Sequence, residues 1–143
     1  MWLLLLACAQ PPVAPRAERW AAHRETLRQT LGEAYDAPLP SADPALAARG
    51  AEIYTKSCAP CHGHSGRGDS PRGPTLSPPP ADLLEGEGAT FFSDAAQLHI
   101  IAEGLPGTAM PPWSRALSPE EQRAVYATVQ RMRGQTGVTD FLR

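Results

Sequence analysis

The stretch Cys58-Ala59-Pro60-Cys61-His62 decides most of what the sequence says about this chain. Residues three apart in a helical turn lie on one face, so two thiols with this spacing can each add to a vinyl group along one porphyrin edge. The histidine that follows is then held over the ring, where an imidazole nitrogen can bind iron. The pattern predicts one covalently attached c-type haem, with Cys58 and Cys61 as attachment points and His62 as an axial ligand.

A C-x-x-C pair also occurs in thioredoxin-like redox sites and in zinc sites, so two alternatives stand beside haem. The first alternative requires a βαβ context, and no convincing strand is expected near the motif. The second requires a further cluster of ligands, and the remaining candidates are scattered singly: Cys8, His23, His64 and His99. Haem is the interpretation that the pattern favours.

The composition indicates a small domain that needs a cofactor to complete its core. The chain has 143 residues, of which only 6% are aromatic, and its 16 prolines predict much non-repetitive backbone. Apolar side chains alone give a marginal core in so small a domain, and a covalent haem would add a large apolar plate. The formal charge is −2 and there is a single lysine, so nucleic acid is not an expected partner.

The N-terminus resembles a bacterial lipobox. An apolar run ends in Leu5-Leu6-Ala7-Cys8, which would make Cys8 the lipidated residue. The run is shorter than the usual apolar region of a signal peptide and no cation precedes it, and it is too short to span a bilayer. Residues 1–8 are interpreted as a signal or lipobox segment, with a truncated ordinary signal peptide as the alternative. Both place the chain on the periplasmic side of a bacterial envelope, and lipidation would anchor it to a membrane.

Residues 9–44 are expected to form an N-terminal extension. Helical composition predicts a helix over residues 16–34, and a linker rich in proline and turn formers is expected over 35–44. Whether this helix packs on the domain or belongs to a tether stays open at this point.

Residues 45–133 are expected to form the haem domain. A helix over 45–57 should run directly into the motif, and residues 63–88 should form a loop around the haem edge. Ser93 and Gly104 predict the two ends of a helix over 94–103. A last helix should begin at Pro119 and run to about Arg133, followed by a tail over 134–143.

Three methionines are candidates for the second axial position on iron. Met1 is terminal, and Met132 falls in the last turn of a helix, where a core role is expected. Met110 lies in Gly107-Thr108-Ala109-Met110-Pro111-Pro112-Trp113, where the prolines stiffen the backbone and could hold a thioether at the iron. His99, His64 and His23 are the weaker alternatives, and each is interpreted as a packing, loop or surface residue.

Several segments together resemble class I cytochromes c in order and spacing, over roughly residues 45–133: residues 50–54, the motif with Gly63, Gly73-Pro74 and residues 104–113. The resemblance, which is to single-haem bacterial domains, implies a small all-α bundle around haem with Met110 as distal ligand. It also implies that the Pro74 carbonyl accepts the Nδ1 proton of His62, which would fix the ring orientation.

One departure from that family concerns the packing of the first and last helices. Gly50 and Tyr54 fit the family pattern on the first helix. Thr128 stands where the last helix usually carries an aromatic residue, and Tyr126 lies two positions away on another face. The contact between the two helices is therefore expected to be rearranged.

His and Met ligation fills both axial positions on iron, and Met raises the reduction potential. With no other catalytic constellation in view, the sequence predicts a one-electron carrier rather than an enzyme. Its expected partners are redox proteins that dock briefly at the haem edge, with membrane contact only through an anchor at Cys8. Two alternatives remain: a haem subunit docked in a larger oxidoreductase complex, and a gas sensor in which Met110 leaves the iron.

Overall fold

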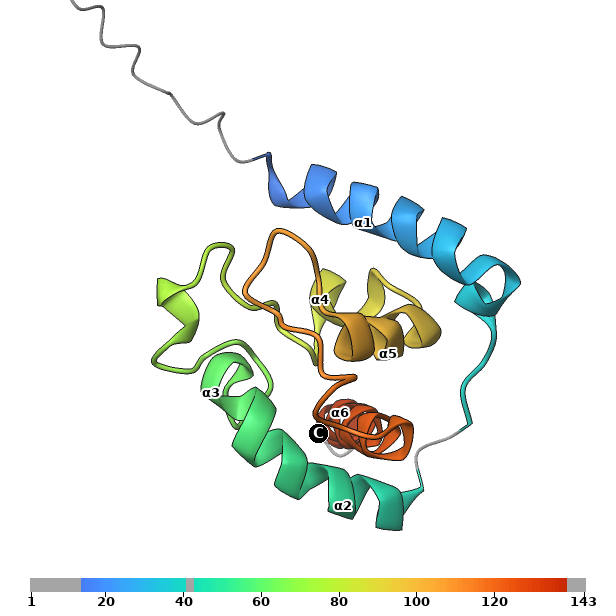
Figure 1. The fold of residues 1–143 in the computed structure, drawn as a ribbon. Coiled ribbons are helices and arrows are strands. Elements are labelled where there is room, and N and C mark those ends of the chain that lie inside the picture. The colour runs from blue at the N-terminus through green and yellow to red at the C-terminus, as the bar shows by residue number, and fades with distance from the viewer. Residues whose placement is uncertain (1–13, 41–42, 139–143) are drawn as a thin grey trace, which may run out of the picture.

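A computed structural model describes residues 14–40 and 43–138, and within these ranges all regular structure is helical (Figure 1). The elements in chain order are α1 (Arg16–Leu31), the 3-10 helix η1 (Gly32–Asp36), α2 (Pro44–Ile53), the π-helical turn η2 (Tyr54–Cys58), α3 (Ala59–His62), the 3-10 turn η3 (Gly73–Thr75), α4 (Gly86–Thr90), α5 (Asp94–Glu103) and α6 (Pro119–Val138). The prediction of an all-α fold is confirmed for the described residues. The predicted lipidation residue Cys8 lies outside the described residues.

Helices α2 and α6 pack closely side by side (Figure 1). A Cβ atom on Gly50 would overlap the carbonyl oxygen of Ala124 and would lie 2.6 Å from the Thr128 hydroxyl oxygen. The Thr128 hydroxyl donates a 2.8 Å hydrogen bond to the Ala47 carbonyl oxygen. The small Gly50 and the Thr128 hydroxyl thus meet at the crossing of the two helices, and no aromatic ring from position 128 takes part in this contact.

Helix α1 lies on the opposite side of the molecule from α2, with α4 and α5 between them (Figure 1). Leu27 of α1 and Tyr35 of η1 are buried in a cluster with Phe92 and Ala96. The Trp20 ring also packs here, with its centroid 5.8 Å from that of Phe92. The open question about this helix is therefore answered: it packs on the domain.

A second buried cluster joins the haem-motif end of the molecule to α6. Its members come from η2, α3 and α6: Tyr54, Ala59, Val125 and Val129, with Met132 among the partly buried residues against it. Met132 thus has the core role predicted for it.

The expected helix ends at residues 93–121 follow from local chemistry. The Ser93 hydroxyl accepts a hydrogen bond from the Ala96 N–H, and Gly104 ends α5 with a φ of 75°. At α6 the Glu121 N–H donates to the Ser118 hydroxyl, while the Glu121 carboxylate accepts from the Ser118 N–H. This reciprocal pair is a capping box, which satisfies two N–H groups that the first turn of a helix leaves without partners.

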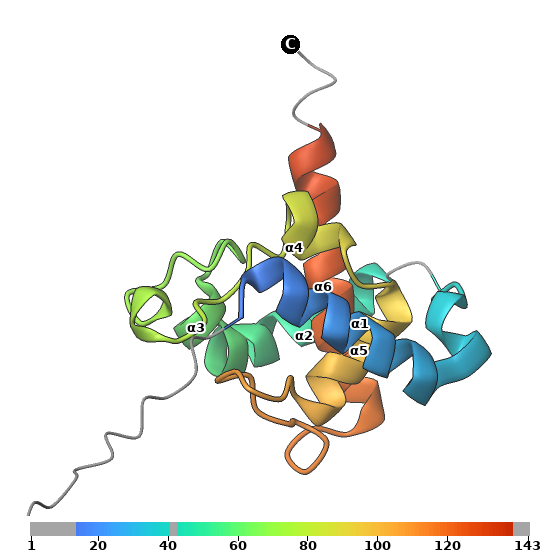
Figure 2. The same ribbon diagram turned by 90° about the horizontal axis from the view of Figure 1, so that it is seen from above.

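Two predicted helix ends were wrong. Helix α1 ends at Leu31, and the chain continues as η1, where Tyr35 is buried rather than part of a linker. Helix α6 passes through Gly134 to Val138, so its end projects beyond the body of the molecule (Figure 2). Glycine is costly inside a helix but ends one only when it adopts a positive φ. Residues 63–88 are mostly loop as expected, although they include η3 and the start of α4.

Candidate haem site

The C-x-x-C-H motif is built into a tight helical segment. Cys58 is the last residue of η2 and precedes α3, which contains Cys61 and His62. Gly63 ends this helix with a φ of 78°, and a Cβ at that position would overlap a carboxylate oxygen of Asp69. The motif is therefore held as one helical turn that requires glycine immediately after it.

Hydrogen bonds from the following loop fix the backbone of the motif. The Gly68 N–H donates to the His62 carbonyl oxygen at 2.8 Å. The Ser70 hydroxyl donates to the Cys61 carbonyl oxygen at 2.8 Å and accepts from the Gly73 N–H at 2.8 Å. Through Ser70, the segment that contains η3 is fastened to the motif.

Cys58, Cys61 and His62 all line one cavity of about 410 Å³, within the size range of about 300–1,000 Å³ that ligand pockets occupy. Burial, with a smaller contribution from Cys61, raises the pKa of the Cys58 thiol to about 11. Redox-active dithiols have lowered thiol pKa values because the thiolate is the nucleophile. The environment of Cys58 therefore disfavours the thioredoxin-like alternative.

The His62 ring lines the cavity, and one of its two nitrogens is enclosed by the protein. Its Nδ1 atom is buried and has no hydrogen-bond partner in the described part of the chain, so Nδ1 is not bonded to the Pro74 carbonyl in this structure. Burial also lowers the pKa of His62, which keeps the imidazole in the neutral form that binds metal. Because Nδ1 is enclosed, Nε2 is the nitrogen available to a ligand in the cavity.

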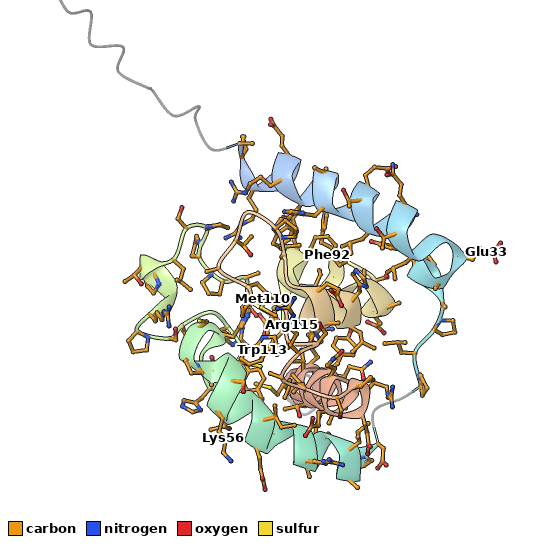
Figure 3. The ribbon with its side chains drawn as sticks, in the orientation of Figure 1. Glu33, Lys56, Phe92, Met110, Trp113 and Arg115 are labelled. Atoms are coloured by element: carbon orange, nitrogen blue, oxygen red, sulfur yellow. The ribbon has the colours of Figure 1, made fainter. Side chains whose placement is uncertain are left out.

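Met110 lines the same cavity from the loop that joins α5 to α6 (Figure 3). The loop is closed by a hydrogen bond from the Leu105 N–H to the Met110 carbonyl oxygen at 3.3 Å, and the Met110 N–H donates to the Thr108 hydroxyl at 3.1 Å. The loop packs on Gly104, where a Cβ would lie 2.8 Å from the Met110 carbonyl oxygen. The structure thus brings Met110 and the motif to one cavity from segments 48 positions apart in sequence.

The remaining wall of the cavity is largely apolar. It includes residues from α5, from α6, from the loop after the motif and from the loop that carries Met110: Leu76, Pro78, Leu83, Ile100, Trp113 and Val125. The Gln97 amide also reaches the wall, where it is held by bonds from its Nε2 to the Phe92 carbonyl and from Arg133 to its Oε1, at 2.9 and 2.6 Å. A flat apolar group with iron at its centre fits this donor set, since it would be met by two thiols, an imidazole and a thioether.

The other ligand candidates do not reach the cavity. His64 is exposed, while His99 and His23 are half-buried on α5 and α1, and none of the three lines the cavity wall. Within residues 14–40 and 43–138, no group of three or more His, Cys, Asp or Glu side chains is arranged to hold a metal ion. In the same part of the chain, no helix is both long and apolar enough to cross a membrane.

The sequence did not indicate that α1 contributes to this cavity. Arg16, Arg19 and Trp20 all line it. The helical spacing of Trp20, Leu27 and Leu31 did signal a packed face, but nothing in the local sequence says where that face docks.

A family model described as Cytochrome C oxidase, cbb3-type, subunit III matches residues 45–127, more than half of the chain. The chain belongs to this family. Its matched region is a cytochrome c domain, and membership of a cytochrome c family implies covalently bound haem c. The family range covers both Cys58 and Met110, whereas α1 lies outside it.

Two relatives of this cytochrome are subunits named FixP. This chain is 34% identical over 92 residues to the Cbb3-type cytochrome c oxidase subunit FixP of Azorhizobium caulinodans, and the match covers 64% of this chain and 29% of that subunit. It is 31% identical over 88 residues to the subunit of the same name from Bradyrhizobium diazoefficiens, covering 62% and 28%. The chain therefore spans less than a third of the length of these curated relatives.

A solved structure shares the fold of this cytochrome. The Kuenenia stuttgartiensis reducing HAO-like protein complex Kustc0457/Kustc0458 contains a chain that matches with a TM-score of 0.56 and 27% sequence identity. The match covers 67% of this chain and 47% of that one.

Proposed function

We propose that the chain is a one-electron carrier with a single covalent haem c. Cys58 and Cys61 would hold the haem by thioether bonds, and His62 Nε2 and the Met110 thioether would be its axial ligands. The observation that carries the proposal is that two thiols, an imidazole and a thioether from separate segments line one largely apolar cavity. Haem with such ligands supplies a one-electron iron couple, and Met ligation raises its potential.

The residues of the chain would hold this site in one arrangement. Ser70 and Gly68 fix the backbone of the motif, and Thr108 with Gly104 fixes the loop that carries Met110. Rigid ligands suit electron transfer because little has to reorganise when the charge of the site changes. The apolar wall keeps bulk water from the site, and with both axial positions occupied by side chains the domain is not expected to be an enzyme on its own.

Pro74 keeps the role that the resemblance implies for it, as acceptor of the His62 Nδ1 proton in the haem-loaded protein. Two observations support this: Nδ1 is buried with no partner in the described residues, and η3, which contains Pro74, is tied to the motif through Ser70. The bond would fix the ring and raise the basicity of the ligand.

The proposed setting is a redox chain on the periplasmic side of a bacterial envelope, where the carrier docks briefly with a donor and an acceptor. Lipidation at Cys8 would anchor it to a membrane. The Cys8→Ala variant should then leave the membrane fraction, and its retention there would contradict the anchor.

A stable place in a larger oxidoreductase complex is the second candidate. The observation that favours it is the family match, because the relatives are named as subunits of an oxidase. Copurification of the tagged full chain separates the two settings, since a carrier would be recovered alone and a subunit with its complex.

A redox titration followed by absorption spectroscopy tests the function. The haem-loaded chain should show one one-electron transition and one haem per chain by mass. The native reduced protein should give no spectral change with carbon monoxide. A rapid carbon monoxide complex would instead support the gas-sensor alternative, in which Met110 leaves the iron.

A further inference from the structure

The cavity carries positive charge although the chain as a whole is slightly acidic. The charged side chains that line it in the described part of the chain are three arginines, Arg16, Arg19 and Arg72, and no Asp, Glu or Lys lines it there. The formal charge of the whole chain is −2. This segregation of charge favours a cavity ligand that bears negative groups.

Two of these arginines come from α1, which lies outside the family range of residues 45–127. Trp20, one residue after Arg19, lines the cavity as well. The helix is held in this place by Leu27, which is 7% exposed and buried in the cluster with Phe92 and Ala96. The two arginines are therefore presented to the cavity by a helix that is docked on the domain through contacts of its own.

Neither Arg16 nor Arg19 has an anionic partner within residues 14–40 and 43–138. The Arg19 guanidinium donates to the Ala14 carbonyl oxygen, and the Arg16 guanidinium lies 5.5 Å from the centroid of the Trp20 ring. Elsewhere in these ranges, Arg28, Arg49 and Arg67 each form an ion pair with a carboxylate. The charges of Arg16 and Arg19 thus remain available to a ligand.

We propose that Arg16 and Arg19 form the site that receives the carboxylates of the haem, so that α1, which lies outside the family range, is a wall of the haem site. The inference rests on the proposed function. Haem carries its two carboxylates on different pyrrole rings from the two vinyl groups, so an element other than the one that carries the cysteines can supply the cations that meet them. Arginine suits the task because its planar fork pairs with carboxylates through two parallel hydrogen bonds.

Positive charge at this position favours the reduced haem, which carries one positive charge less than the oxidised form. Replacing Arg16 or Arg19 by glutamine should therefore lower the midpoint potential. The expected effect is up to about a tenfold rise in the oxidised-to-reduced ratio at fixed potential, which corresponds to about 59 mV for a one-electron couple. Raising the ionic strength should shrink the difference between wild type and variant, because salt screens exposed charges.

The experiment is a spectroscopic redox titration of the full haem-loaded chain at low and high salt. The variants are Arg16→Gln, Arg19→Gln and the double change, each beside its Arg→Lys counterpart, which keeps the charge and should keep most of the potential. The matched control is Arg28→Gln, which removes the same charge from the same helix about 13 Å further along its axis than Arg19. Arg28 does not line the cavity and should leave the potential unchanged.

Each outcome decides a separate claim. A wild-type chain that binds no covalent haem contradicts the proposed function itself. If the chain binds haem but the Arg16→Gln and Arg19→Gln variants keep the wild-type potential, only the carboxylate site is contradicted. The carboxylate site is also contradicted if Arg28→Gln shifts the potential equally, because the shift would then reflect the net charge of the chain. Because Arg16 is exposed, its replacement should leave the packing of α1 intact. The Arg16→Gln variant therefore tests the carboxylate site even if the Arg19→Gln change loosens α1.

Discussion

The Tyr54 hydroxyl donates a 2.9 Å hydrogen bond to the Gly63 carbonyl oxygen. These two residues flank the motif, so the bond closes the helical segment that carries Cys58, Cys61 and His62. Tyr54 is only 3% exposed, and burial raises the pKa of its hydroxyl, which stays protonated and able to donate throughout the physiological range. The bond is thus a fixed part of the frame around the candidate haem ligands.

Tyr54→Phe should destabilise the chain while keeping the ring packing. The Gly63 carbonyl oxygen would lose a buried donor, at a cost of about 1–2 kcal/mol in the free energy of unfolding. Denaturant unfolding of the full chain followed by circular dichroism measures this. A free energy of unfolding equal to that of wild type would mean that the bond does not contribute to the frame.

Gly50→Ala should destabilise the α2–α6 crossing, because the added methyl group would overlap the Ala124 carbonyl oxygen. The expected loss is about 2–3 kcal/mol, as for other overpacked sites. Gly134→Ala is the matched control: apart from the backbone of its own helix, no atom of the described residues lies within 4 Å of the added methyl group, and the change should stabilise α6 by about 0.5–1 kcal/mol. Thermal unfolding of both variants checks the pair, and equal effects would contradict the close crossing.

The capping box at α6 predicts a dependence of stability on pH. Hydrogen bonds from the Ser118 N–H and hydroxyl hold the pKa of the Glu121 carboxyl below its usual value of 4.5. A lowered folded-state pKa stabilises the fold above the unfolded value and loses this contribution as the pH falls through the folded value. Glu121→Gln should therefore flatten the stability profile below about pH 4.5. An unchanged profile would show that the carboxylate does not cap the helix.

Leu27→Ala should release α1 from the domain. Leu27 is buried, and truncation of buried leucines costs about 2–5 kcal/mol. Hydrogen exchange followed by mass spectrometry should show faster exchange in α1 than in α6, since Leu27 belongs to a cluster that contains no residue of α6. The exposed change Gln29→Ala is the control and should leave exchange in both helices unchanged. Uniformly faster exchange would mean that α1 unfolds only together with the domain.

The parts of the fold that could be predicted from the sequence are those that depend on local chemistry. Ser93 and Ser118 cap their helices because a hydroxyl and a nearby N–H suffice, whatever the rest of the chain does. The motif and the stiff Met110 segment were recognisable for a similar reason, since each carries its chemistry within a few residues. The structure then places both on one cavity.

The parts that could not be predicted depend on contacts between distant segments. The burial of Tyr35 and the docking of α1 on Phe92 require partners more than 50 residues away, and no local pattern specifies them. Gly134 fails as a helix end because glycine permits a positive φ without imposing it. At position 128 the sequence did signal a departure from the family, but only the crossing with Gly50 explains why a threonine fits there.

The near-infrared absorption band of a methionine-ligated oxidised haem tests the central claim most directly. The oxidised full chain should show this band. The Met132→Leu variant should keep it, because Met132 packs against the buried cluster that contains Val125 and Val129, and the Met110→Leu variant should lose it. A band that persists in Met110→Leu, or is missing from the wild-type chain, would contradict Met110 as the distal ligand and with it the proposed carrier site.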